Sequence, residues 1–290
     1  MMSDFHTIEN DHLKLAVSNL GAEMKSLYIH SWSRELLWVP KSENEKLIWS
    51  RTSPILFPIV GKLKNNSYRF NQKTYSMPQH GFARDSQFNC LKNTKSELEL
   101  SLHSNPETFQ QYPFHFELKV RYFLVENTLS IIYTTLNTGQ QDLYFSIGAH
   151  PAFATPDLSH YEIRFEKNEK EYFQLNNGLV DFEQLFPVES NIVKPSESLF
   201  KNDALIFQDV QSSYIELIHQ QRNEIVRLNG IKTPYFGIWG KASVPFICLE
   251  PWYGLGDDTH HDQTLIHKKG VQFLPPGDEF VFSFSIEIRA

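Results

Sequence analysis

Three short blocks of the sequence, far apart along the chain, each hold one side chain that can transfer a proton. They read QHGFAR around His80, GAHPAF around His150 and LEPW around Glu250. The titratable residue in each block has mostly glycine, proline and apolar neighbours, which give it little water. Two imidazoles and a carboxylate in one cleft can pass protons to and from a bound molecule without a metal ion. We therefore expect Glu250, His150 and His80 to be catalytic, and we expect neither a metal nor a cofactor.

The backbone next to His150 and Glu250 favours a fixed, buried setting for both side chains. A residue before a proline is held in extended geometry, so Pro151 fixes the direction of the His150 imidazole. The ordinary pKa of a histidine, about 6.5, lets it gain or lose a proton near neutral pH. Glu250 ends an apolar run, and burial raises the pKa of a carboxylate and makes it a better base. The alternatives are structural: a buried histidine that donates to a carbonyl group, and a carboxylate paired with Arg51 or Arg227.

Four further residues are candidates for binding a substrate. The guanidinium groups of Arg51 and Arg84 can each hold two hydroxyl groups or a phosphate. Asp203 precedes an apolar run, where it can bind a ligand or cap a turn. Trp252 can stack on a sugar or fill the core. The structural alternatives are that the arginines form ion pairs within the fold and that His80 caps a turn.

A group of acidic residues and histidines at residues 257–262, which read DDTHHD, resembles a metal-binding loop but lacks the spacing of one. It has no glycine at the sharp turn of a calcium loop and no glutamate at the closing position. We expect a solvated loop here. The two cysteines, Cys90 and Cys248, are too few for a disulfide framework and form no CxxC motif.

The bulk properties of the chain argue against several function classes. A net charge of -7 over 290 residues argues against nucleic acid as a partner, because proteins that bind it usually carry a basic face. The first residues have neither a basic start nor an apolar stretch, so we expect no signal peptide. No apolar run approaches ~18 residues, so we expect no membrane contact. We expect a cytoplasmic protein, present as a monomer or a homodimer.

Apolar and polar residues alternate along most of the chain, a pattern typical of strands with one buried face. The clearest runs are residues 98–103, 114–122 and 280–288. Shorter runs of the same kind are residues 13–17, 129–135, 163–165, 214–218 and 225–228. Turn-forming residues such as Asn176–Gly178 separate these runs, which indicates strands joined by tight turns.

Many short strands at even spacing indicate a sandwich or a barrel, in which helices contribute little. No amphipathic run of about ten residues or more is present. We expect only brief helical turns near residues 107–111 and 181–185. No linker, repeat or low-complexity segment divides the chain. We therefore predict an all-β fold, a large antiparallel β-sandwich of two sheets, as a single domain over residues 1–290.

In their order and flanking residues, these blocks resemble the aldose 1-epimerase family of galactose mutarotase-like proteins. The resemblance covers most of the chain, from residues 22–27 (AEMKSL) through the blocks around His80 and His150 to EPW and residues 269–270. It implies a large antiparallel β-sandwich of the galactose mutarotase-like type, the supersandwich. It also implies a small-molecule sugar as the partner, a site in a cleft of the sandwich, and no cofactor.

The same resemblance implies a role for each matching residue. Glu250 resembles the general base of the family, and His150 resembles the general acid. His80 resembles the second histidine, which binds near the ring oxygen. Arg51 and Asp203 stand at the places of the residues that bind the sugar.

The two histidine blocks depart from the pattern usual in galactose mutarotases. Those proteins carry an Asn-His-Gly-Gly type of block where this chain has QHGF, and Thr or Ser commonly follows the second histidine where this chain has Pro151. The sequence is more similar to a bacterial branch of epimerase-like proteins. Sugar-phosphate 1-epimerases share the His-Gly-Phe-Ala-Arg block, which brings phosphorylated sugars into consideration.

The sequence supports three hypotheses about function. The first is an aldose 1-epimerase that interconverts the α and β anomers of an aldohexose by acid–base ring opening. There we expect Glu250 ionised and His150 protonated, because opposite charges within about 4–6 Å favour both charged forms. The second is a hexose-6-phosphate 1-epimerase in which Arg51 and Arg84, with Lys62, hold the phosphate by charge-assisted bonds. The third is a non-catalytic carbohydrate-binding or sensing protein.

Overall fold

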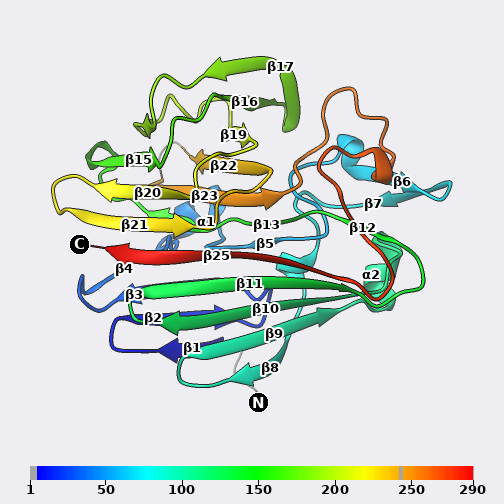
Figure 1. The fold of residues 1–290 in the computed structure, drawn as a ribbon, viewed down its shortest axis with the longest axis horizontal. Helices are drawn as coiled ribbons and strands as arrows, with labels where there is room; N and C mark the ends of the chain where they lie inside the picture. Colours follow the sequence, from blue (N-terminus) through cyan, green and yellow to red (C-terminus); the bar gives the residue numbers. More distant parts are fainter. Residues whose placement is uncertain (1–4, 242–243, 290) are drawn as a thin grey trace.

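The computed structural model describes residues 5–241 and 244–289, and within them the chain forms two large antiparallel sheets (Figure 1). The first has nine strands in the order β18-β15-β20-β21-β25-β11-β10-β9-β8. In chain order these strands are β8 (Asn89–Asn93), β9 (Glu97–His103), β10 (Phe116–Val125), β11 (Thr128–Asn137), β15 (Tyr161–Phe165), β18 (Ile192–Val193), β20 (Tyr214–His219), β21 (Glu224–Asn229) and β25 (Glu279–Arg289).

The second large sheet has eight strands, in the order β17-β16-β19-β22-β23-β13-β5, with β14 also paired to β23. Its strands are β5 (Ile55–Leu56), β13 (Ile147–Ala149), β14 (Ala152–Ala154), β16 (Glu171–Asn176), β17 (Leu179–Pro187), β19 (Leu205–Gln208), β22 (Tyr235–Gly240) and β23 (Phe246–Tyr253). In Figure 1 its edge strand β17 and the neighbouring β16 lie at the top, and β8 and β9 of the first sheet lie at the bottom.

Smaller elements complete the described part of the chain. A four-stranded sheet contains β1 (Phe5–Glu9), β2 (Leu13–Ser18), β3 (Met24–Ile29) and β4 (Arg34–Glu35). Two two-stranded sheets are formed by β6 (Ser67–Phe70) with β7 (Lys73–Ser76), and by β12 (Leu143–Phe145) with β24 (Gln272–Leu274). The helices are α1 (Glu43–Ile48) and α2 (Pro106–Gln111), and the 3-10 turns are η1 (Lys64–Asn66), η2 (Ala83–Asp85), η3 (Leu158–His160) and η4 (Leu265–His267).

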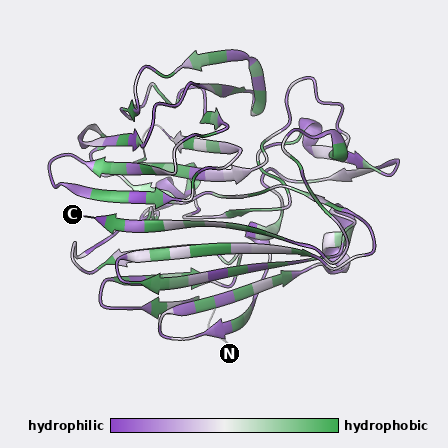
Figure 2. Ribbon diagram, viewed as in Figure 1, coloured by the Kyte–Doolittle hydropathy of each residue, from purple (hydrophilic) through white to green (hydrophobic). Residues whose placement is uncertain are grey.

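The two large sheets pack face to face around the main hydrophobic core. Alternation along β10 buries Phe116, Leu118 and Val120 and leaves their polar neighbours partly exposed. Figure 2 shows the same alternation as hydrophobic and hydrophilic bands along the strands. Aromatic rings join the sheets, since the ring centroids of Phe165 on β15 and Phe207 on β19 lie 4.9 Å apart. The structure confirms the predicted antiparallel β-sandwich.

The helical segments differ in part from the expectation. The turn expected near residues 107–111 is α2, which Asn105 caps by accepting hydrogen bonds from the N–H groups of Glu107 and Thr108. The helical turn expected near residues 181–185 is wrong, because this segment belongs to β17 and pairs with β16. Helix α1 was not expected. Among the described residues, no helix is long and apolar enough to cross a membrane.

The eight-stranded sheet has two covered faces, which sets the place of the candidate residues. On β23, Ile247 and Leu249 belong to the core between the sheets. The alternate residues Cys248 and Trp252 lie in two separate apolar clusters. Because successive side chains of a strand point to opposite faces, Glu250 shares the outer face with these two residues.

Two glycines on neighbouring strands make room for the indole of Trp252. A Cβ atom on Gly148 of β13 would lie 2.5 Å from Trp252 Cδ1, and one on Gly237 of β22 would lie 2.7 Å from Trp252 Cη2. Contacts this short force a shift of the ring. The glycines therefore let Trp252 lie flat against the sheet beside Glu250, to which Gly237 is the paired residue.

Candidate active site

A cavity of about 440 Å³ opens on the outer face of the eight-stranded sheet. Its wall includes all seven residues that the sequence analysis selected: Glu250, His150, His80, Arg51, Arg84, Asp203 and Trp252. They come from distant stretches of the chain: strand β23, the loops beside β5, β7, β13 and β19, and the turn η2. Lys62, the third residue considered for phosphate, lines the cavity as well.

Glu250 and His150 face each other at the bottom of this cavity. Nε2 of His150 lies 3.3 Å from Oε2 of Glu250, and the two side chains are 9% and 1% exposed. Neither Glu250 Oε2 nor His150 Nδ1 has a hydrogen-bond partner within the part of the chain that the structure describes. Trp252 Nε1 is unpartnered too, although the indole is near enough to lower the pKa of the carboxyl group. Because buried polar atoms normally have partners, these atoms are ready for a polar ligand.

Neither arginine considered as a structural partner neutralises Glu250. Arg227 donates to Glu216 through Nη2 at 2.7 Å, on the nine-stranded sheet. Arg51 donates to Asp85 Oδ1 at 2.6 Å. The ion-pair alternative for Glu250 with these two arginines is therefore wrong.

Burial shifts the pKa values of the facing groups in opposite directions. Loss of water, assisted by the charge of Asp203, raises the pKa of Glu250 well above its ordinary value. Loss of water lowers the pKa of His150 to about 3, and Arg84 and Arg51 add to this effect. Burial thus favours the uncharged form of each group. It opposes the mutual attraction on which the expected pair of ionised Glu250 and protonated His150 rests.

An aromatic wall removes water from His150. The rings of Trp49 and His150 stack with centroids 5.4 Å apart, and Trp239 approaches His150 edge-on at 5.6 Å. Trp49 is the C-cap of α1, where its N–H donates to Glu45. Sequence reasoning missed Trp49 and α1. The signal was present in the Ser42–Glu45 capping box, which marks a helix start.

His80 is held in one tautomer by the backbone. Its φ angle is 65°, and its N–H donates to the carbonyl of Gly61 at 2.8 Å. The N–H of Gly61 donates in return to Nδ1 of His80 at 3.1 Å. An Nδ1 that accepts a hydrogen bond carries no proton, so the proton of the neutral ring is on Nε2. Burial, with His150 and nearby arginines, lowers the pKa of His80 well below its ordinary value, so the ring is a neutral donor.

The turn after His80 requires a glycine at position 81. Gly81 has a φ angle of 71°, and a Cβ atom there would lie 2.2 Å from the carbonyl oxygen of Phe57. Only glycine fits this position without moving the backbone. His80 thus has the predicted structural role in a turn and also lines the cavity.

The remaining candidates combine structural bonds with a place in the cavity wall. Arg84 donates through Nη2 to the carbonyl of Gln79 at 2.6 Å, and its Nε lies 3.7 Å from Asp85. The ion pairs expected as an alternative for the arginines are therefore present. Asp203 caps its turn by accepting the N–H of Ala204 at 3.0 Å, and burial raises its pKa.

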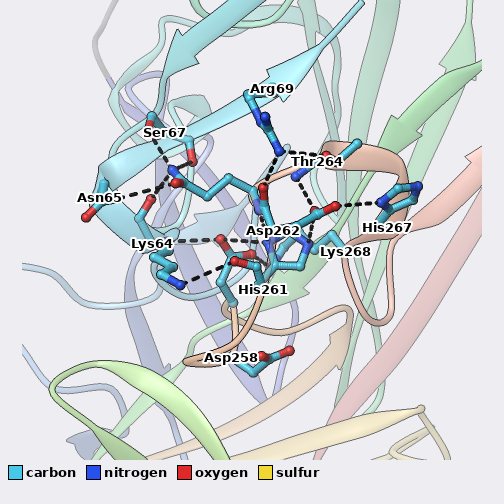
Figure 3. Close-up of polar contacts among 12 residues, drawn as sticks. Lys64, Asn65, Ser67, Arg69, Asp258, His261, Asp262, Thr264, His267 and Lys268 are labelled. Atoms are coloured by element: carbon cyan, nitrogen blue, oxygen red, sulfur yellow. Dashed lines mark hydrogen bonds and ion pairs between the residues drawn. The ribbon is translucent and has the colours of Figure 1, made fainter. Parts of the chain in front are cut away.

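Residues 257–262 are only in part the solvated loop that we expected, because the side chains of His260 and Asp262 are 81% and 49% exposed but Asp257 is buried. Asp257 is 1% exposed, and its Oδ1 accepts a hydrogen bond from the buried Nζ of Lys268 at 2.9 Å. His261 Nδ1 lies 3.3 Å from Oδ2 of Asp257. Figure 3 shows Lys64, His261 and Lys268 close together in this network of polar contacts. Burial alone would raise the pKa of Asp257, but the bonds from His261 and Lys268 lower it. The prediction fails for Asp257 because the contact that Lys268 makes with this carboxylate depends on how the chain folds.

This buried ion pair fixes the segment that holds His80. Asp257 Oδ2 accepts the N–H of Lys64 at 2.9 Å, and the N–H of Asp257 donates to the carbonyl of Lys62 at 2.9 Å. The neighbouring Gly61 is the residue that exchanges two hydrogen bonds with His80. Asp257 and Lys268 therefore position His80 through the backbone of residues 61–64.

Comparison with known proteins gives the family. A family model described as aldose 1-epimerase matches residues 4–270. The chain belongs to the aldose 1-epimerase family. Members of this family are isomerases that act on sugars, so the protein is an enzyme of the isomerase class with a small-molecule sugar as its ligand.

Relatives of the epimerase support the same assignment over nearly the whole chain. The plasmid LacX protein of Lactococcus lactis subsp. lactis is 28% identical over 299 residues, which cover 97% of this chain and 98% of LacX. The solved structure of a galactose mutarotase related enzyme from Lactobacillus acidophilus is 32% identical, with a TM-score of 0.93 over 99% of this chain and 97% of that one. A galactose mutarotase-like protein from Lactobacillus casei has a TM-score of 0.89 at 29% identity and covers 98% and 100%. The fold is thus galactose mutarotase-like.

Replacing Lys268 by Met leaves the carboxylate of Asp257 buried without its cation. We expect the free energy of unfolding to fall by about 3–5 kcal/mol, because removing one partner of a buried pair strands the other charge. Urea denaturation followed by tryptophan fluorescence measures the change. Lys92→Met, which breaks an exposed pair with Glu97, is the control and should cost far less. Equal losses in the two variants would show that the buried pair does not hold this loop.

Proposed function

We propose that the enzyme interconverts the α and β anomers of an aldohexose by acid–base ring opening. The observation that carries this proposal is the Glu250–His150 pair, buried at 3.3 Å with unpaired polar atoms in a cavity of about 440 Å³. Ligand pockets for small molecules have volumes of this order. Trp49, Trp239 and Trp252 supply the flat apolar surface on which the C–H face of a pyranose packs.

The pair has what ring opening requires, namely one group that takes a proton and one that gives a proton. The shared proton can lie on either group without a change in net charge. When it lies on His150, Glu250 accepts the proton of the anomeric hydroxyl while His150 donates to the ring oxygen. The bond between C1 and the ring oxygen breaks, and C1 becomes an aldehyde carbon.

Ring closure reverses both transfers. After rotation about the C1–C2 bond, the new hydroxyl group attacks the other face of the aldehyde. His150 takes back the proton from that hydroxyl, and Glu250 returns its proton to the carbonyl oxygen. The pair ends with the one proton that it had at the start. His80, with its proton on Nε2, donates a hydrogen bond near the ring oxygen, and Asp203 accepts one from a sugar hydroxyl.

Glu250→Gln removes the base and keeps the shape of the side chain. We expect anomer exchange to fall by roughly 10²–10⁴-fold, the usual contribution of a positioned acid–base group. Exchange is measured by NMR on α-glucose and α-galactose, and sugar binding by calorimetry should stay close to that of the parent protein. Glu183→Gln, at a side chain that is 81% exposed, is the control and should change neither quantity. Normal exchange in Glu250→Gln would remove this carboxylate from the mechanism.

The pH dependence of the reaction should report a pair and not a free imidazole. Because burial lowers the pKa of His150 to about 3, the pair takes up a second proton only in strong acid. We expect kcat/KM for a free aldohexose to stay constant as the pH falls from about 7 to about 5, where an ordinary histidine with a pKa of about 6.5 would titrate. Polarimetry in buffers of constant ionic strength measures it. An inflection near the ordinary histidine value would contradict the shared-proton account.

A second substrate class is favoured by the charge of the cavity wall. Lys46, Lys62 and Lys241 line the cavity together with the two arginines, in a chain whose net charge is -7. These basic residues outnumber the acidic residues of the same wall, Asp203 and Glu250, and an excess of positive charge concentrates anionic ligands. This supports a hexose 6-phosphate as the aldose that the same pair acts on.

The comparison of glucose and galactose with their 6-phosphates distinguishes the two substrate classes. If the phosphate is bound, Lys62→Met should lower kcat/KM for glucose 6-phosphate by roughly tenfold or more, since it removes a charge-assisted bond, and leave glucose unchanged. Lys73→Met, at an exposed site on β7, is the matched control. Equal losses for both sugars would count against a phosphate contact. Binding of every sugar without faster exchange would favour the non-catalytic carbohydrate-binding hypothesis.

A further inference from the structure

A third group that can bind metals lies beside the Glu250–His150 pair. The thiol of Cys248, a ring nitrogen of His150 and a carboxylate oxygen of Glu250 all lie within 4.8 Å of one another, and all three residues are buried. Cys248 is two residues before Glu250 on β23 and so points to the same face. Its partner across the sheet is Ala152, two residues after His150. Adjacent strands thus bring together a thiol, an imidazole and a carboxyl group.

We propose that Cys248, His150 and Glu250 form a binding site for a divalent metal ion that favours thiolate ligands, such as Zn²⁺, and that the bound ion blocks anomer exchange. The binding step is independent of the proposed function. The blocking step rests on it, because it assumes that the same two groups carry out the proton transfers.

The spacing of the ligand atoms fits a tetrahedral ion. Two ligand atoms that are each about 2.0–2.1 Å from a zinc ion, at a tetrahedral angle, lie about 3.3 Å apart. The distance between His150 Nε2 and Glu250 Oε2 is 3.3 Å. A thiolate binds zinc at about 2.3 Å, which places it roughly 3.6 Å from the other ligand atoms. The three ligand atoms lie within 4.8 Å of one another, so a small rotation of the Cys248 side chain can bring its sulfur to the distance that a zinc ion requires.

The charge and the open side of the site also suit a zinc-like ion. A thiolate and a carboxylate balance the two positive charges, so the complex is neutral, as a buried position requires. Binding releases two protons, one from the thiol and one that the pair shares. His150 and Glu250 line the cavity and Cys248 does not, so the fourth coordination position faces the cavity. That position can take a water molecule or a sugar hydroxyl.

Other groups of ligands in the described residues lack these properties. Asp257, next to His261, is already bound by Lys268. Asp262 and His267 form a pair whose side chains are 49% and 60% exposed. Cys90 is exposed, and its thiol donates to a backbone carbonyl. By contrast, Glu250 Oε2 is buried and has no hydrogen-bond partner among the residues that the structure describes.

A metal ion at this position stops the proposed reaction for a simple reason. It occupies the nitrogen of His150 and the oxygen of Glu250 between which the proton moves. A ligated imidazole nitrogen cannot donate to the ring oxygen, and a ligated carboxylate is a weak base. Cys248 itself takes no part in ring opening, so its removal should protect the enzyme from the ion and leave exchange in metal-free buffer unchanged.

Cobalt titration tests the binding step directly. The full-length protein, reduced and freed of metal by a chelator, is titrated with Co²⁺ and then with Zn²⁺, alongside the variants Cys248→Ser and Cys90→Ser. We expect a thiolate-to-cobalt charge-transfer band in the parent protein and in Cys90→Ser, and none in Cys248→Ser. We expect the affinity for Zn²⁺, measured by calorimetry, to fall by more than about tenfold in Cys248→Ser, because thiolate is the softest ligand of the set. Cys248→Ala serves if the serine variant does not fold.

Anomer exchange with and without Zn²⁺ tests the blocking step. The ion should inhibit the parent protein and Cys90→Ser, a chelator should restore exchange, and Cys248→Ser should resist. Absence of metal binding, or equal affinity in the parent and Cys248→Ser, would overturn the metal site. Binding through Cys248 with undiminished exchange would overturn the blocking role. If metal-free protein shows no exchange with any sugar, the proposed function fails, and the cobalt spectra alone still decide the metal site.

Discussion

The site depends on one constraint: a carboxyl group and an imidazole are buried together and face each other at 3.3 Å. Leaving a buried polar group without a full set of partners is costly, so the fold must impose this arrangement. Glu250 does so from a strand with paired neighbours on both sides, and His150 from the short link between β13 and β14. The arginines nearest the site are bound to Asp85 and to backbone carbonyls, which keeps them from neutralising Glu250. The pair is thus left for a ligand to complete.

The surroundings of the pair act through two kinds of contact. Trp49 and Trp239 exclude water from His150, and this exclusion moves both pKa values toward the uncharged forms. A separate network of backbone bonds, anchored by the buried Asp257–Lys268 pair, holds His80 in a single tautomer. The pKa values of the pair and the position of His80 are therefore set by different parts of the chain. Replacing a single aromatic residue can change the pKa values, whereas the position of His80 depends on the whole loop that contains Asp257 and Lys268.

Much of the fold could be predicted from the sequence, because period-two alternation reports directly which face of a strand is buried. The seven candidate residues could be selected from their local sequence, because each has a polar group in an apolar or turn-forming setting. Helix α1 and Trp49 were missed because a six-residue helix is too short to show an apolar period. The role of Asp257 was missed because the burial of Lys268 depends on packing, which local sequence does not show.

The protonation state of the pair could not be predicted for a related reason. Local sequence suggests that Glu250 is buried, but the balance between desolvation and attraction depends on every group around both side chains. Asp203, Arg51 and Arg84 enter that balance from other parts of the fold. The attraction alone suggested an ion pair, and the loss of water around both side chains opposes it. The identity of the sugar depends on the wall of the cavity, which includes lysines that belong to no recognisable sequence motif.

The protonation state of His150 in solution tests this account most directly. It can be read from the ¹⁵N NMR shifts of the two ring nitrogens in histidine-labelled protein between about pH 5 and 7, with a His150→Gln variant for assignment. The account predicts the shifts of a neutral imidazole, unchanged across this range. A ring that is doubly protonated, or that titrates near the ordinary histidine pKa, would contradict it.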